Sequence, residues 1–267
     1  MENIKIISMD FDGTLLTSDK KITEKTKSIL KRCRDNNYII IGITARNLAS
    51  AKDVLDINIQ LFDYIILNNG AFLLNVKTGD VTSYGTISNS DLRKIESVFK
   101  NTNAKCEYVS LNKYYMIGVN DPKGIRVNIN STSEIDEEIA RMNVYLETEE
   151  ELNYYKNVIL ENIKTVNVVS MKDTDNKNTK LWLTINEKGT NKLIALTKIL
   201  KKISVSLNQV IFFGDGENDL SLLENVGMGV AMGNAIDEVK NRSKAITLSN
   251  NEDGIYIYLT NNLIFKQ

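Results

Sequence analysis

Two aspartates lie two positions apart where the first apolar run of the chain ends, in the segment Met9-Asp10-Phe11-Asp12-Gly13-Thr14-Leu15. The Asp-Gly pair predicts a turn, because glycine adopts backbone angles that other residues avoid. Ligands bind at the carboxyl ends of strands in open α/β sheets. Asp10 and Asp12 are therefore candidate catalytic residues. The alternative for this segment alone is a simple turn beside a solvated carboxylate.

A second acidic segment, Phe213-Gly214-Asp215-Gly216-Glu217-Asn218-Asp219, follows another apolar run. Its carboxylates suit a cation that takes oxygen ligands. An EF-hand loop starting at Asp215 would need glycine at its sixth position and glutamate at its twelfth, but these are Leu220 and Val226. The EF-hand is excluded, and Asp215 and Asp219 remain candidate metal ligands.

Groups that could bind an anion lie elsewhere in the chain. Thr44 ends an apolar run in Gly42-Ile43-Thr44-Ala45-Arg46, where its hydroxyl and the following amides could hold an anion at a helix N-terminus. The alternative for Thr44 is a helix N-cap. Lys188 and Lys192 lie near the start of a predicted helix, and for either one a solvated surface position is the alternative.

If the first and fourth apolar runs form neighbouring strands, Asp10, Asp12, Asp215 and Asp219 converge. Two carboxylates about 4 Å apart repel by roughly 4 kcal/mol at an effective dielectric constant of 20, so a cation among them would be stabilising. Mg²⁺ suits a few carboxylates with water and usually accompanies phosphate. With Thr44 and a lysine for the anion, the residues predict a phosphate-handling Mg²⁺ site.

Composition excludes several classes of protein. The 267-residue chain has no histidine, which excludes Ser-His-Asp and Cys-His catalysis and histidine-ligated metals. Cys33 and Cys106 are far apart in sequence and predict neither a zinc site nor a disulfide framework. A formal net charge of -1 without a basic block argues against nucleic acid or a membrane as partner. Since no secretory signal or apolar span is visible, we expect a cytoplasmic protein.

Near-continuous apolar runs predict strands that are buried on both faces, as in a parallel sheet. They are Ile4–Met9, Tyr38–Ile43, Tyr64–Leu67, Val210–Phe213 and Val226–Met232. Helical periodicity separates the first three, over Ile22–Cys33 and more weakly over Asn47–Asp56. Asn68-Asn69-Gly70 predicts a turn before a hairpin of Ala71–Val76 and Val81–Tyr84. Alternating strands and helices predict a doubly wound, Rossmann-like α/β fold.

The pattern changes after about Thr86. Strands are predicted at Cys106–Ser110, Tyr115–Val119, Ile125–Ile129, Val166–Met171 and Leu181–Ile185, and helices at Asp91–Lys100, Glu134–Met142 and Glu149–Glu161, with a polar loop at Lys172–Thr179. Strands that alternate apolar and polar residues suit an antiparallel sheet with helices on one face. We therefore predict an inserted α+β domain, after which the helix Thr190–Lys202 returns the chain to the first domain.

Taken together, these segments resemble the haloacid dehalogenase (HAD) superfamily, in its Cof-type (subfamily IIB) phosphatase branch. The matching segments are Asp10-Phe11-Asp12-Gly13-Thr14, Thr44, Lys192, Gly214-Asp215-Gly216-Glu217-Asn218-Asp219, Ala231-Met232-Gly233-Asn234-Ala235 and Glu252-Asp253-Gly254. Ala45 stands where this branch usually has glycine, and Lys188 remains the alternative to Lys192. The resemblance implies a catalytic core of residues 1–84 and 186–267 and an inserted cap of the C2B type over residues 85–185.

The resemblance also implies a role for each site residue. Asp10 would be the nucleophile that forms an aspartyl-phosphate, and Asp12 the general acid and base. Mg²⁺ would be held by Asp10, the backbone carbonyl of Asp12 and Asp215, with Asp219 binding it directly or supporting a ligand. Phosphoryl oxygens would be held by Thr44, Lys192, Asn218 and the backbone amides of Phe11 and Ala45, and Arg46 would touch the organic part of the substrate.

The expected function is a Mg²⁺-dependent phosphatase of small phosphorylated metabolites, such as sugar phosphates or cofactor phosphates. A phosphomutase on the same scaffold and a non-catalytic phosphometabolite-binding protein are the alternatives. Asp10 and Asp12 are both present, which argues against the non-catalytic protein. The cap residues Tyr114, Tyr115 and Arg126 are candidate substrate contacts, with packing as their alternative. The sequence leaves the substrate open and allows a monomer or a homodimer.

Overall fold

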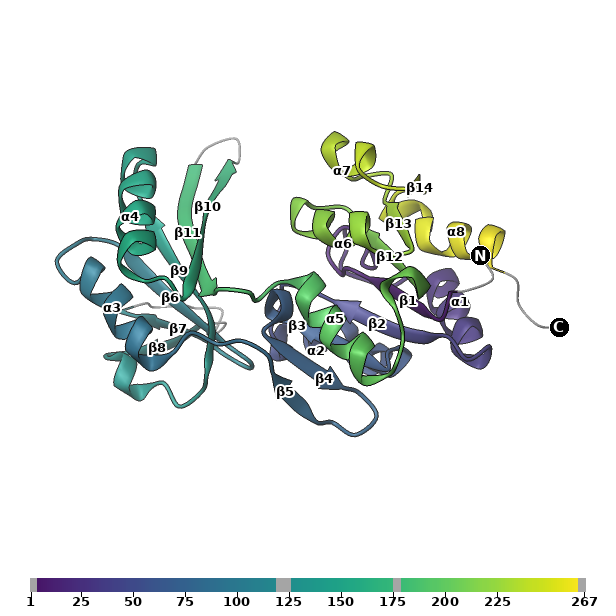
Figure 1. Cartoon of the computed structure of the whole chain (residues 1–267), viewed down its shortest axis with the longest axis horizontal. Helices are drawn as coiled ribbons and strands as arrows, with labels where there is room; N and C mark the ends of the chain where they lie inside the picture. The colour runs from purple at the N-terminus through teal and green to yellow at the C-terminus, as the bar shows by residue number, and fades with distance from the viewer. Residues whose placement is uncertain (1–3, 119–125, 175–178, 264–267) are drawn as a thin grey trace. The chain divides into compact units, whose positions relative to one another are not determined.

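The computed structural model describes residues 4–118, 126–174 and 179–263. The chain forms two compact units, which are described separately (Figure 1). The core unit comprises Met1–Arg46, Ser50–Thr82 and Asn191–Gln267, and the inserted unit comprises Asn47–Ala49 and Ser83–Thr190. Within the described ranges, no helix is long and apolar enough to cross a membrane.

An eight-stranded sheet organises the core unit, in the order β14-β13-β12-β1-β2-β3-β4-β5. Its strands are β1 (Ile6–Met9), β2 (Ile39–Ile43), β3 (Tyr64–Leu67), β4 (Phe72–Asn75), β5 (Val81–Ser83), β12 (Val210–Gly214), β13 (Met228–Ala231) and β14 (Ala245–Ile246). β1 pairs in parallel with β2 on one side and β12 on the other. Every residue of β1 and β12 is buried, as the continuous apolar runs predict. The doubly wound α/β core is therefore confirmed.

The helices of the core unit are α1 (Glu24–Asp35), α2 (Leu48–Leu55), which begins within the inserted unit, α5 (Lys192–Lys202), α6 (Leu220–Asn225), α7 (Asp237–Asn241) and α8 (Gly254–Asn262). The sequence periodicity predicts α1, α2 and α5 and makes no prediction for the other three. α1 buries Ile29, Leu30 and Cys33, the face that the sequence predicts. α5 begins two residues later than predicted, because Asn191 is extended and its side chain caps the helix by accepting the amide hydrogen of Ile194.

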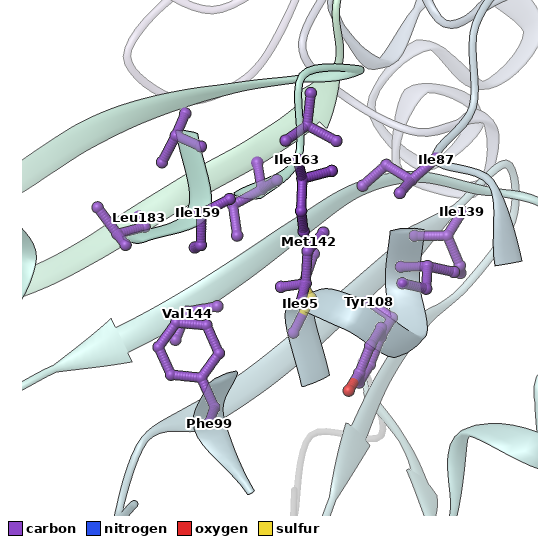
Figure 2. Close-up of a cluster of buried hydrophobic side chains, with 14 of the residues drawn as sticks. Ile87, Ile95, Phe99, Tyr108, Ile139, Met142, Val144, Ile159, Ile163 and Leu183 are labelled. Atoms are coloured by element: carbon purple, nitrogen blue, oxygen red, sulfur yellow. The ribbon is translucent and has the colours of Figure 1, made fainter. Parts of the chain in front are cut away.

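The inserted unit is a six-stranded sheet with helices packed on one face. The sheet order is β10-β11-β9-β6-β7-β8. Its strands are β6 (Lys105–Ser110), β7 (Tyr114–Ile117), β8 (Arg126–Ile129), β9 (Ile139–Leu146), β10 (Val166–Thr174) and β11 (Thr179–Glu187), and its helices are α3 (Asn89–Phe99) and α4 (Glu149–Asn162). Figure 2 shows side chains of α3, α4 and the strands gathered in one apolar cluster, which is the separate core of this unit.

Two predictions for this unit are wrong. The segment Glu134–Met142 is not a helix, since Ile139–Leu146 forms the strand β9 between β6 and β11. The spacing of Ile135, Ile139 and Met142 imitates a helical face, but pairing on both edges of β9 outweighs this local preference. The predicted polar loop Lys172–Thr179 is wrong at both ends, because β10 continues to Thr174 and β11 begins at Thr179.

The predicted sheet differs in one further respect and is partly outside the described residues. β7 and β8 pair in parallel, although the alternating pattern predicts antiparallel neighbours. Val119 and Ile125, the ends of two predicted strands, lie outside the described residues.

Candidate active site

The strand register brings the two acidic segments together. Met9 of β1 lies opposite Phe213 of β12, and the amide of Asp10 donates to the carbonyl of Phe213 over 3.0 Å. Because the strands are parallel, the residues that follow them leave the sheet at the same edge. Asp10 and Asp215 thus come from neighbouring strand ends, with more than two hundred residues between them in sequence.

Three carboxylates and one lysine form the centre of the site. Asp10, Asp215 and Asp219 each present an oxygen atom within 4.8 Å of the others. Lys192 Nζ donates to Asp10 Oδ1 over 2.6 Å and to Asp219 Oδ1 over 2.7 Å. The Lys192 side chain is only 1% exposed, so this ammonium group belongs to the site and not to the surface.

Local turns hold the carboxylates in place. Thr14 Oγ1 donates to Asp215 Oδ1 over 2.7 Å. Asp219 Oδ2 accepts the backbone amides of Asp215 and Gly216 over 3.1 and 3.2 Å, which closes the loop after β12. Gly13 has a φ of +78°, and a Cβ atom there would lie 2.1 Å from Asp215 Oδ2. Only glycine permits this close approach at this backbone angle.

Burial and charge shift the protonation equilibria of the site. Burial raises the pKa of Asp10, and Asp219 and Asp215 add to this shift against the opposing effect of Lys192. Burial also raises the pKa of Asp215. For Lys192, burial favours the neutral amine, but the carboxylates of Asp10 and Asp219 outweigh it and the pKa is raised. The site therefore contains a charged lysine among carboxylates that are costly to ionise together.

Asp12 makes a separate set of contacts. Arg46 binds both of its oxygens, through Nε to Oδ2 over 2.7 Å and through Nη2 to Oδ1 over 2.6 Å. Lys20 Nζ donates to Oδ1 over 2.8 Å. Burial raises the pKa of Asp12, but the hydrogen bonds from Arg46 and Lys20 outweigh it, so the pKa is lowered. Arg46 also donates to Ser50 Oγ over 2.8 Å, which fixes the guanidinium group.

The other predicted residues lie at the same sheet edge or beside it. Thr44 is buried at the end of β2, and its hydroxyl accepts the amide of Arg46 over 3.1 Å. Phe11 is buried, and its ring packs on Phe62 with centroids 5.6 Å apart. Ala45 follows Thr44 and is half-buried.

Two predicted residues are exposed. Asn218 is exposed, and its side-chain oxygen lies close to Gly216. Lys188 is exposed, so Lys192 is the lysine that contacts Asp10.

The residues present fit Mg²⁺. The close group offers carboxylate oxygens alone, and hard divalent cations prefer oxygen ligands. The carboxylate of Asp12 stands outside this group, because Arg46 and Lys20 bind it. The Asp12 carboxylate is therefore not one of the grouped carboxylates.

Two residues that shape the site are not predicted from the sequence. Lys20 contacts Asp12. Its φ of 59° is typical of a tight turn. A single lysine in a turn forms no sequence pattern from which this contact could be predicted. Asn234 Nδ2 donates to the carbonyl of Gly13 over 2.8 Å and so ties the loop after β13 to the loop after β1. Asn234 belongs to the segment Ala231–Ala235, which contributes to the family resemblance. That resemblance does not predict the contact between Asn234 and Gly13.

Comparisons with known proteins agree with this architecture. The family model of haloacid dehalogenase-like hydrolases matches residues 7–259. The chain is 28% identical over 267 residues to the 5-amino-6-(5-phospho-D-ribitylamino)uracil phosphatase YitU of Bacillus subtilis, covering 95% of this chain and 96% of that protein. It superposes on TM0651 from Thermotoga maritima with a TM-score of 0.83 and 25% identity, covering 98% of each chain. A HAD subclass IIB sugar phosphatase gives a TM-score of 0.76 at 21% identity, covering 96% of this chain and 98% of that one.

Proposed function

Because the chain belongs to the haloacid dehalogenase-like hydrolase family, in its Cof-type branch, we propose that it is a Mg²⁺-dependent phosphatase of small phosphorylated metabolites. The observation that carries the proposal is the close group of Asp10, Asp215 and Asp219 around Lys192. Three carboxylates of this kind suit a divalent cation, and the lysine suits a phosphoryl group.

Asp10 is the proposed nucleophile. Its carboxylate oxygen forms a bond to phosphorus while the bond from phosphorus to the leaving oxygen breaks, which gives an aspartyl-phosphate. Asp12 donates a proton to the departing alkoxide and then takes a proton from the water molecule that hydrolyses the intermediate. Arg46 and Lys20 favour the anionic form of the Asp12 carboxylate. Asp12 therefore acts as an acid only after these contacts loosen on substrate binding and it takes up a proton from solvent or from the phosphate monoanion of the substrate.

Cationic and hydrogen-bonding groups would offset the charge of the phosphoryl oxygens. When bound, Mg²⁺ supplies positive charge against those oxygens and against the carboxylates that hold it. Asp10, Asp215 and the backbone carbonyl of Asp12 are its proposed ligands, and Asp219 supports the loop through its hydrogen bonds to the amides of Asp215 and Gly216. Lys192, Thr44, Asn218 and the amides of Phe11 and Ala45 are the proposed phosphoryl-binding groups.

The substrate class is proposed from the relatives. YitU is named as a phosphatase of a phosphorylated ribitylaminouracil, and the subclass IIB protein is named as a sugar phosphatase. Sugar phosphates and cofactor phosphates are therefore the proposed substrates. We assign recognition of the organic part to Arg46 and to the inserted residues 85–185, and we place the protein in the cytoplasm as a monomer or homodimer.

The test is release of inorganic phosphate from a panel of phosphorylated metabolites with Mg²⁺. Substituting Asp10→Asn should lower the rate by about 10³-fold or more, because the amide is a poor nucleophile. Asp35→Asn, at the exposed end of α1, is the matched control and should keep the rate. EDTA should stop the wild-type reaction and excess Mg²⁺ should restore it. Undiminished phosphate release by a folded Asp10→Asn protein, judged by circular dichroism, would refute the nucleophile.

A further inference from the structure

One face of the sheet in the inserted unit does not take part in the apolar core of that unit. Figure 2 shows Met142 and Val144 of β9 among the apolar side chains that pack with α3 and α4. Successive side chains of a strand point to opposite faces, so Arg141, Asn143 and Tyr145 lie on the other face, called here the open face. Polar and aromatic residues are concentrated on it.

A hydrogen-bonded network occupies the middle of the open face. Glu107 of β6 is only 3% exposed. Its carboxylate accepts from Arg126 Nε over 2.7 Å, from Asn143 Nδ2 over 2.8 Å and from the Tyr145 hydroxyl over 3.3 Å. Thr184 of β11 donates to Asn143 Oδ1 over 3.1 Å, which extends the network to a further strand. The negative charge of Glu107 is thus already balanced by Arg126.

Arg141, on the same face, has a donor without a partner among the described residues. It lies in register between Val109 of β6 and Asn186 of β11. Its Nε is buried and has no hydrogen-bond acceptor among the described residues. Burial lowers the pKa of Arg141, and the groups that oppose this effect are Tyr114, Glu107 and Tyr145. Arg141 as a whole is only partly buried. Its covered Nε lacks an acceptor, and a buried polar group without a hydrogen-bond partner is costly.

We propose that the open face binds a small organic carboxylate, with the guanidinium group of Arg141 as its anchor. The planar guanidinium group of arginine can donate two parallel hydrogen bonds to a carboxylate. The rings of Tyr145 and Trp182, with centroids 6.2 Å apart, offer a flat surface for the carbon skeleton. The carboxylate belongs either to the organic part of the phosphatase substrate, which rests on the proposed function, or to a separate effector.

Trp182 makes the site measurable, because it is the only tryptophan of the chain and it lies on the open face. Fluorescence of the full-length Asp10→Asn protein is titrated with gluconate, 6-phosphogluconate and glucose 6-phosphate. The two carboxylates should change the fluorescence, and Arg141→Gln should weaken their binding by about tenfold or more. Arg141→Lys keeps the positive charge but loses the planar pair of donors, so its affinity for the carboxylates should lie between those of the Arg141→Gln protein and the protein with Arg141. Lys100→Gln removes an exposed charge at the end of α3, on the helix-covered side of the sheet, and should leave binding unchanged.

A second comparison distinguishes a carboxylate of the substrate from a carboxylate of a separate effector. A substrate carboxylate gives tighter binding of 6-phosphogluconate than of gluconate, together with a higher kcat/KM than for glucose 6-phosphate. A separate effector gives equal affinities for the two carboxylates and no difference in kcat/KM. Either result supports the site. No fluorescence response to either carboxylate, or a response that Arg141→Gln leaves unchanged, overturns it. Absence of phosphate release from every substrate would instead count against the proposed function, since the fluorescence measurement does not depend on turnover.

Discussion

Lys192 shows how one buried side chain can be required for both stability and chemistry. Its ammonium group contacts Asp10 and Asp219, and all three residues are buried. Removing one partner of a buried ion pair leaves the other charge uncompensated, which costs more than an exposed pair would. The same ammonium group is the proposed partner of the phosphoryl oxygens.

We expect Lys192→Met to lower the free energy of unfolding of the metal-free protein by about 3 kcal/mol, because Asp10 and Asp219 lose their counter-charge. Phosphate release should also fall by about 10²-fold or more, because a cationic phosphoryl contact is lost. Chemical denaturation and a phosphate assay measure the two effects. Lys188→Met, at an exposed lysine, is the control and should change neither. Equal effects of the two substitutions would show that the contacts of Lys192 are unimportant.

At the scale of elements, the turn after β1 decides whether Asp215 can reach the site. Gly13 and Gly79 share a positive φ, +78° and +77° respectively, but a Cβ atom at Gly79 would meet nothing within 4 Å. An alanine at either position strains the backbone, but only an alanine at Gly13 would also clash with Asp215. This makes Gly79→Ala a matched control for Gly13→Ala.

Both alanine substitutions should cost about 1 kcal/mol of unfolding free energy through the left-handed backbone. Gly13→Ala should cost more, because its Cβ displaces the Asp215 carboxylate, and it should weaken Mg²⁺ binding as well. Isothermal titration with Mg²⁺ and denaturation measure the two quantities. If Gly13→Ala binds Mg²⁺ as well as Gly79→Ala does, Asp215 is not a ligand.

The first turn of α3 carries a pH-dependent contribution to the stability of the inserted unit. Asp91 is 7% exposed. Its carboxylate accepts from Thr165 over 2.7 Å, from Lys94 over 3.0 Å and from Ser88 over 2.9 Å. These hydrogen bonds, that of Thr165 first, lower its pKa below the ordinary value of 3.8.

The unfolded chain therefore binds a proton to Asp91 more readily than the folded protein does. The stabilisation is fully present above the unfolded pKa and is lost as the pH falls through the folded pKa. We expect Asp91→Asn to cost about 1 to 2 kcal/mol at pH 7 and progressively less below pH 4. Denaturation followed by Trp182 fluorescence tests this, with Asp173→Asn, an exposed aspartate of β10, as the control. A cost that does not change with pH would refute the charge-based account.

At the scale of the molecule, the chain contains two units with separate apolar cores. The proposed Mg²⁺ ligands all belong to the core unit, whereas Trp182 belongs to the inserted unit. A ligand stabilises only the structure that binds it. Metal binding should therefore raise the unfolding temperature of the core unit and not that of the inserted unit.

We expect Mg²⁺ at about 100 times its Kd to stabilise the core unit by about 2.7 kcal/mol. The thermal transition of the core unit, followed by circular dichroism, should rise in temperature, while the transition reported by Trp182 should not. The Asp215→Asn protein should lose the Mg²⁺-dependent rise. A rise of equal size in both transitions would show that the two units unfold together.

Local sequence pattern by itself determined the core strands and the main candidate acids of this protein. Continuous apolar runs predict the buried parallel strands, because a strand covered on both faces cannot carry alternating polar residues. The candidate acids Asp10 and Asp215 follow from their position at strand ends, and the absence of histidine excludes whole classes of catalysis. The strand predictions hold because each depends on residues that are neighbours in the chain.

Tertiary structure alone decided which side chains meet. The pairing of Lys192 with Asp10 joins residues 182 positions apart, and that of Arg46 with Asp12 joins residues 34 apart. The segment Ile139–Leu146 became a strand because β6 and β11 pair with its two edges, against a helical spacing of apolar residues. Arg141 faces away from the core for the same reason. Strand pairing and ion pairing act between distant segments, so their outcome depends on the whole fold and not on local sequence.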